Sequence, residues 1–290
     1  MSSPAPSHSP EHRRLSVGPD ILRAVDFADL TLAQWQRFDT HAAHKFALQV
    51  AEQVGGRVSA VQSTQHGGAP LHQAVIEHNC GLFALVPGGT TLVGYDVERW
   101  QPSARLLAAY REQTLARGFG FPADPRDLLN EYLAPRRTVT LPALLVAVDS
   151  EHLTVPADQT PQVLSERALR MPSPDEWEHA CAAGATTLWR WAEQCPLDRS
   201  PYGYREGPHK QLNAFGLHIA HEVYDAELTS DPSVIKGGDG GEAVCGGYGS
   251  FVEWLPLATA NRNPNMAEFI HGPDGEDMYE DFHIRPVIEI

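Results

Sequence analysis

The sequence has no long hydrophobic run, which argues against a membrane-spanning helix and against a secretory signal. No apolar stretch approaches the roughly 20 residues that a membrane-spanning helix needs. The first residues are rich in Ser, Pro and His and contain no hydrophobic core of a secretory signal. We therefore expect no membrane segment, and we take the cytoplasm as the expected location.

Positive charge is also scarce. The chain has 22 Lys and Arg against 37 Asp and Glu, which gives a formal net charge of −15. A surface this acidic repels phosphate backbones and anionic lipid headgroups. We therefore expect neither nucleic acid nor a membrane surface as a partner, and we expect a peptide or small-molecule ligand instead.

Cysteine is sparse and irregularly spaced. The four cysteines, Cys80, Cys181, Cys195 and Cys245, include no C-x-x-C pair, which argues against a zinc ribbon or finger. Four thiols are also few for a disulfide scaffold of 290 residues. We expect reduced thiols.

Glycine and proline, in contrast, are plentiful, with 24 and 23 residues. Both residues interrupt helices and strands, so they favour a loop-rich fold over a helical bundle or a repeating βα architecture. A chain of 290 residues is long enough to bury a substantial core.

The chain divides into three parts by its patterns. Residues 1–18 predict a disordered tail, and residues 19–79 predict a helix followed by a hairpin. This extension is too short for a robust core of its own, so we expect it to pack on a main domain over residues 80–290.

Two helices have clear sequence signals. Apolar residues at helical spacing predict one long helix over 27–54. A helix over 174–183 has a strong start, because Ser173 is a good cap, Pro174 suits the first helical position and Glu176 completes a capping box. The other predicted elements are the hairpin strands 57–64 and 71–77, the strands 82–86, 90–96, 137–148 and 283–290, and a helix over 103–116.

Several segments between Cys80 and Ile290 resemble, in the correct order, the formylglycine-generating enzyme family, also called the sulfatase-modifying-factor family. The clearest are 170–178, similar to the family's RLPTEAEWE helix start, and 213–217, which matches N-x-x-G-L. The remaining segments are 83–89, 135–142, 236–238 and 284–287. The resemblance implies an α+β fold, irregular and related to C-type lectins, with the N-terminal helix and hairpin packed on it.

The best-known members of this family oxidise a peptidyl cysteine with two cysteines that bind copper, soon after a glycine pair. Here residues 237–247 contain only Cys245, and its spacing matches neither expected position. The glycines allow the backbone to pass close to a ligand or a neighbouring loop, so Asp239, Glu242 and Cys245 would project around a pocket. Cys245 and Asp239 are therefore the candidate catalytic residues; the alternative is a tight crossing with Cys245 buried.

A second candidate cluster contains His218, His221, Glu222 and Asp225. Two imidazoles with nearby carboxylates suit iron, manganese or zinc, and other relatives of this family use a non-heme iron. The segment also replaces the family's calcium-binding stretch, which implies a structural calcium near Glu222 and Asp225. The alternative is that one histidine is a hydrogen-bonded polar residue and the other is solvated, since a strand would place them on opposite faces.

Two functional hypotheses follow. The first is a divergent metal- or thiol-dependent oxidoreductase, using copper or iron, that acts on a peptide or small molecule. The second is a non-catalytic ligand- or protein-binding domain on the same scaffold. A titratable cluster in a pocket would favour the first, and an exposed aromatic patch the second. In either case Arg285 resembles the family's buried arginine, for which we expect a structural role through bidentate pairing.

Overall fold

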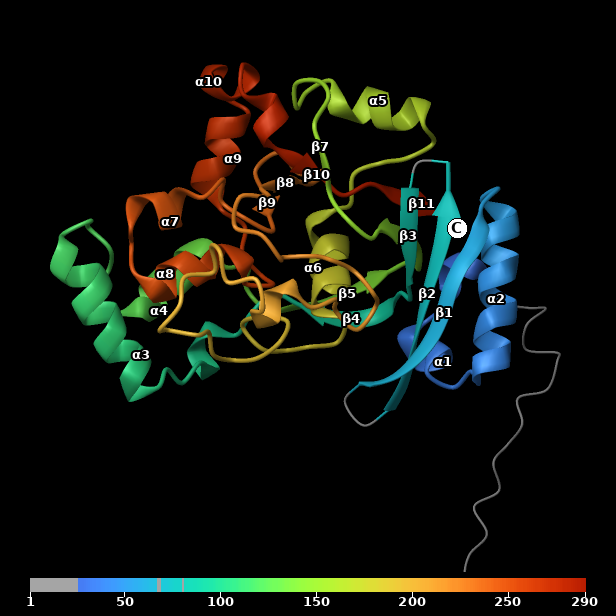
Figure 1. Cartoon of the computed structure of the whole chain (residues 1–290), viewed down its shortest axis with the longest axis horizontal. Coiled ribbons are helices and arrows are strands. Elements are labelled where there is room, and N and C mark those ends of the chain that lie inside the picture. The colour runs from blue at the N-terminus through green and yellow to red at the C-terminus, as the bar shows by residue number, and fades with distance from the viewer. Residues whose placement is uncertain (1–25, 67–68, 80) are drawn as a thin grey trace, which may run out of the picture.

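The computed structural model describes residues 26–66, 69–79 and 81–290, and it combines short helices with small sheets (Figure 1). The predicted tail, the hairpin residues 67–68 and Cys80 lie outside the described residues. The strands are β1 (Arg57–His66), β2 (Ala69–His78), β3 (Gly81–Val86), β4 (Gly89–Val93), β5 (Arg137–Leu141), β6 (Leu144–Ala147), β7 (Glu151–His152), β8 (Glu227–Leu228), β9 (Ile235–Lys236), β10 (His283–Ile284) and β11 (Val287–Glu289).

The helices are short and distributed along the whole described chain. They are α1 (Leu32–Trp35), α2 (Thr40–Gln53), α3 (Ala104–Ala109), α4 (Pro125–Tyr132), α5 (Thr160–Glu166), α6 (Pro174–Ala182), α7 (Glu242–Gly246), α8 (Ser250–Trp254), α9 (Pro264–Ile270) and α10 (Pro273–Glu276). The protein is therefore of the α+β class. No helix in the described part is long and apolar enough to cross a membrane.

The main sheet has the order β1-β2-β3-β6-β11, with every neighbouring pair antiparallel. The predicted hairpin is confirmed as β1 and β2, and β2 continues into the sheet by pairing with β3. Helix α2 packs against this hairpin at one end of the molecule (Figure 1). The Trp35 indole is buried there and donates to the carbonyl of His72 at 2.8 Å.

The single helix predicted over 27–54 is wrong in its extent. The chain forms α1 and then starts again as α2, because the Asp39 side chain accepts a hydrogen bond from the Ala42 N–H and caps a new helix. The helix predicted over 174–183 is confirmed as α6. Its capping box between Ser173 and Glu176 is present in both directions.

Proline divides two strands that were predicted as continuous. The segment 137–148 becomes β5 and β6, which belong to different sheets and are separated at Pro142. The segment 283–290 becomes β10 and β11, separated at Pro286, and these also lie in different sheets. Proline lacks the N–H that a sheet ladder needs, so it ends each strand where the chain changes partners.

The expected structural role of Arg285 is confirmed. The guanidinium is fully buried and donates to both carboxylate oxygens of Glu227, at 2.6 and 2.9 Å. Its other N–H groups reach the carbonyls of Ala147, Val148 and His218 at 2.8 to 2.9 Å. One side chain thus ties together the end of β6, β8 and the loop at His218.

We predict that Arg285→Ala lowers the free energy of unfolding by about 3–5 kcal/mol, because the buried Glu227 carboxylate loses its counter-charge. Urea unfolding followed by circular dichroism measures the change. Arg57→Ala is the matched control, since it removes an ion pair with Glu77 whose two side chains are exposed. Equal midpoint shifts in the two variants would contradict the prediction.

Candidate functional site

The glycine-rich segment after β9 is held by close backbone packing. Lys236 is buried and its ammonium donates to Glu178 at 2.5 Å, which fixes the start of the segment on α6. At Gly238, a Cβ atom would lie 2.7 Å from the carbonyl oxygen of Val223. Only glycine permits this approach, so the segment crosses the loop before Asp225 at a fixed distance.

Asp239 is buried directly after this crossing and organises the turn into α7. Its carboxylate accepts hydrogen bonds from the N–H groups of Gly241 and Ala243, both at 2.9 Å. Burial raises the pKa of Asp239 to about 6, although these N–H groups oppose the shift. Asp239 is therefore a positioning group whose carboxylate also faces a pocket.

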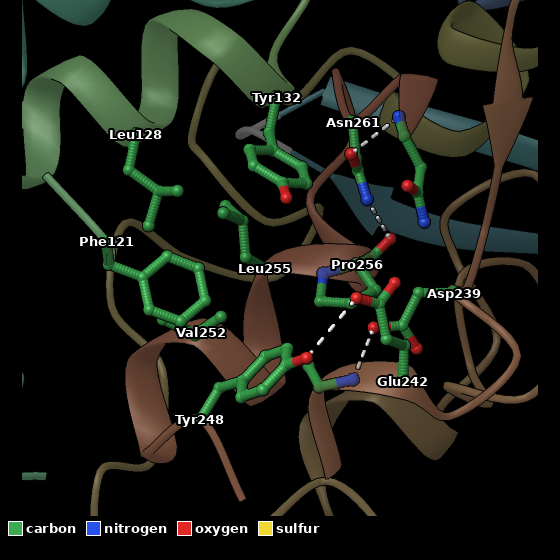
Figure 2. Close-up of a pocket in the computed structure, with 12 residues that line it drawn as sticks. Phe121, Leu128, Tyr132, Asp239, Glu242, Tyr248, Val252, Leu255, Pro256 and Asn261 are labelled. Atoms are coloured by element: carbon green, nitrogen blue, oxygen red, sulfur yellow. Dashed lines mark hydrogen bonds between the residues drawn. The ribbon is translucent and has the colours of Figure 1, made fainter. Parts of the chain in front are cut away.

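That pocket, which we call the α7 pocket, lies between α4, α7 and α8 and has a cavity volume of about 30 Å³. Figure 2 shows Phe121, Val252 and Tyr248 on one side, with Asp239 and Glu242 on the other. Its lining residues are Phe121, Leu128, Tyr132, Asp239, Glu242, Ala243, Tyr248, Val252, Leu255, Pro256, Asn261 and Asn263.

Cys245 lies on α7 but does not line the α7 pocket. Its thiol is exposed, and its sulfur lies 3.3 Å from the hydroxyl oxygen of Tyr224. Cys181 and Cys195 are buried, and burial raises the pKa of each thiol to about 12. The structure therefore places Asp239 and Glu242 at a pocket and leaves Cys245, the third residue expected there, outside it. The alternative of a buried Cys245 is wrong, because the thiol is exposed.

The cysteines in the described part of the chain are not arranged as a copper site. A linear Cu(I) site needs two soft ligands, preferably thiolates. Of the three described cysteines, Cys245 is exposed on α7, whereas Cys181 and Cys195 are neutral thiols within the core. Across residues 26–66, 69–79 and 81–290, no three His, Cys, Asp or Glu side chains are arranged to hold a metal ion.

The predicted histidine cluster is divided among different partners. His218 pairs through Nδ1 with Asp149 at 2.8 Å, while His221 Nε2 lies 3.9 Å from Asp225. Asp225 also lies 3.6 Å from His283 Nε2, on β10. Sequence reasoning missed Asp149 and His283, because Asp149, between β6 and β7, and His283, on β10, are both far from the cluster in the chain.

The Glu222 carboxylate is paired with the Lys210 ammonium, so it is not free to bind calcium. Lys210 donates to its carboxylate at 2.7 Å. Burial, assisted by Glu227 and Glu222, raises the pKa of Asp225 to about 6. Iron or calcium therefore finds no complete ligand set among His218, His221, Glu222 and Asp225 as they are placed.

Comparison of the sequence with models of known protein families gives no match, and comparison with curated proteins gives none either.

The His221–Asp225 pair predicts two opposite effects of pH on stability. Burial lowers the folded-state pKa of His221 to about 4 from its ordinary 6.5, so its stabilising contribution is lost as pH falls from 6.5 towards 4. The folded-state pKa of Asp225, about 6, lies above its ordinary 3.8, so its contribution is lost as pH rises through 6.

We therefore expect His221→Gln to lose less stability than the wild type on acidification from pH 6.5 to 4.5, and Asp225→Asn to lose more. Urea midpoints at intermediate pH values measure both variants against the wild type. The two substitutions serve as controls for each other, because changes in the same direction would show that this pair does not set the pH dependence.

Proposed function

We propose that this chain is a divergent formylglycine-generating-enzyme-like domain that binds a small molecule or a peptide side chain in the α7 pocket. The observation that carries the proposal is the pocket itself. It combines an apolar, partly aromatic lining with a few convergent polar groups, which is the usual composition of a ligand site.

The scaffold assignment rests on features in the segments that resemble the family. The segment 170–178 contains the capped start of α6, and 284–287 contains the fully bonded Arg285. The segment 236–238 leads through the Gly238 crossing to the α7 pocket. The pocket thus follows the glycine pair, where the family's active site is expected.

Ligand binding explains the residues around α7 better than copper-dependent oxidation does. Asp239 is buried and held by two N–H groups, which presents its carboxylate in one orientation. The α7 pocket contains no thiol, and the nearest cysteine in sequence, Cys245, points to solvent.

A thiol-dependent oxidoreductase is the second candidate, and the placement of Cys245 favours it. An exposed thiol next to the Tyr224 hydroxyl is accessible to a peptide or small-molecule substrate. If this function holds, Cys245→Ser abolishes turnover and Tyr224→Phe changes its rate, whereas ligand binding in the α7 pocket persists in both variants.

We predict that n-butanol shifts the amide resonances of Glu242, Tyr248 and Val252 in ¹H–¹⁵N correlation spectra, because its hydroxyl end enters the α7 pocket and its alkyl chain lies along the half-buried rings of Phe121 and Tyr248. Val252→Phe should abolish these shifts by filling the cavity. Val234→Phe is the matched control, since Val234 lies outside the pocket, and it should retain them. Absence of shifts at these amides in the wild type, with n-butanol and with its charged four-carbon analogues n-butylammonium and butyrate, would overturn the proposed function.

Metal analysis tests whether the second candidate works with copper. After anaerobic reconstitution with Cu(I), Fe(II), Zn(II) and Ca(II), we expect less than stoichiometric copper, because one exposed thiolate supplies only half of a linear site. Elemental analysis of wild type and Cys245→Ser measures it. Stoichiometric copper that is lost in Cys245→Ser would instead establish a metal-dependent oxidase.

A further inference from the structure

The charged side chains that line the α7 pocket are all acidic. Asp239 and Glu242 contribute carboxylates, and none of the described residues that line the pocket is Lys, Arg or His. Burial raises the pKa of Tyr132 to about 12, and the charges of Glu131, Glu242 and Asp239 act in the same direction. The negative field thus extends across the cavity to α4, on the opposite wall.

Aromatic rings form much of the remaining wall. The rings of Phe121 and Tyr248 lie 5.2 Å apart between centroids at an angle of 69°, and Tyr132 lies above them in Figure 2. The faces of such rings attract cations through the negative charge of the π-system. Leu128 and Val252 add aliphatic surface, which suits the methylene groups attached to an organic cation.

The chemistry of the pocket excludes most other cations. A hard metal ion needs several oxygen ligands, but Asp239 and Glu242 are the only carboxylates among the described residues that line the pocket, and much of the lining is apolar. A cavity of about 30 Å³ is small. It therefore has room for a primary ammonium, the smallest organic cation head, and not for a trimethylammonium or a guanidinium group. The attached methylene chain extends out of the cavity along the half-buried rings of Phe121 and Tyr248.

We propose that the α7 pocket binds a primary alkylammonium group, supplied either by a lysine side chain of a peptide or by a free alkylamine. This inference rests on the proposed function of the pocket as a ligand site. The ammonium lies between the carboxylates of Asp239 and Glu242, and its methylene chain lies against the aromatic and aliphatic walls. Glu242 is exposed, so its carboxylate is free to turn from Tyr248, 3.5 Å away, to the ligand.

The test compares three probes of equal chain length: n-butylammonium, n-butanol and butyrate. Their dissociation constants are measured at pH 7.5 by ¹H–¹⁵N NMR titration of the full chain. We expect n-butylammonium to bind about tenfold or more tightly than n-butanol, because charge-assisted hydrogen bonds and cation–π contact together exceed about 1.4 kcal/mol. Butyrate should bind most weakly.

Glu242→Gln tests the carboxylate without disturbing the fold, because this side chain is exposed. It should weaken n-butylammonium by about three- to tenfold and leave n-butanol unchanged. Glu268→Gln is the matched control, since it removes the same charge from an exposed position on α9 outside the pocket. Equal weakening in both variants would show that net charge alone attracts the amine, and would overturn the inference.

The source of the ammonium is distinguished by Nα-acetyl-lysine methylamide and its Nε-acetylated form. Tighter binding of the lysine derivative than of n-butylammonium assigns a peptide lysine, and the reverse assigns a free alkylamine. Equal or tighter binding of n-butanol or butyrate overturns the cation inference but leaves a ligand site. If no probe shifts the pocket amides, both the inference and the proposed function fail.

Discussion

The structure depends above all on one buried charge pair, that between Arg285 and Glu227. The guanidinium has five N–H groups, and each of its three nitrogens donates within the core. A buried charge without partners would be strongly destabilising, so the fold is stable only when these segments meet in one geometry. Trp177 on α6 adds a further hydrogen bond to Glu227, at 2.6 Å.

This pair also sets the position of both candidate sites. The carbonyl of His218 accepts from Arg285, so the loop that continues to His221 and Asp225 starts from a fixed point. The same loop provides the surface over which Gly238 passes. The α7 pocket is therefore positioned by a chain of contacts that begins in the core, although its own walls come from short helices at the other end of the molecule (Figure 1).

Local features of the fold could be predicted from the sequence, and non-local ones could not. The capping box at Ser173 and the hairpin of β1 and β2 each depend on neighbouring residues, so periodicity and spacing are sufficient to find them. The glycine-rich segment indicated either a pocket with Asp239, Glu242 and Cys245 or a tight crossing with Cys245 buried. The structure has a crossing at Gly238 and a pocket with Asp239 and Glu242, while Cys245 is exposed outside it. The other residues that line the pocket could not be predicted in this way. Phe121 and Tyr132 come from a distant segment, and no spacing rule connects them with α7. The specific lectin-like fold and the cytoplasmic location stay predictions.

The division of the last strands at Pro286 has a consequence for folding kinetics. Strand β10 lies inside the four-stranded sheet, between β7 and β8, while β11 completes the edge of the five-stranded sheet beside β6. Both sheets are therefore complete only when the residues on either side of Pro286 have paired. The pairing of β10 with β7 joins residues that are more than a hundred positions apart in the chain. Pairing at such separation carries a large loop-closure entropy, so we expect both sheets to be completed together, in a late and slow step of folding.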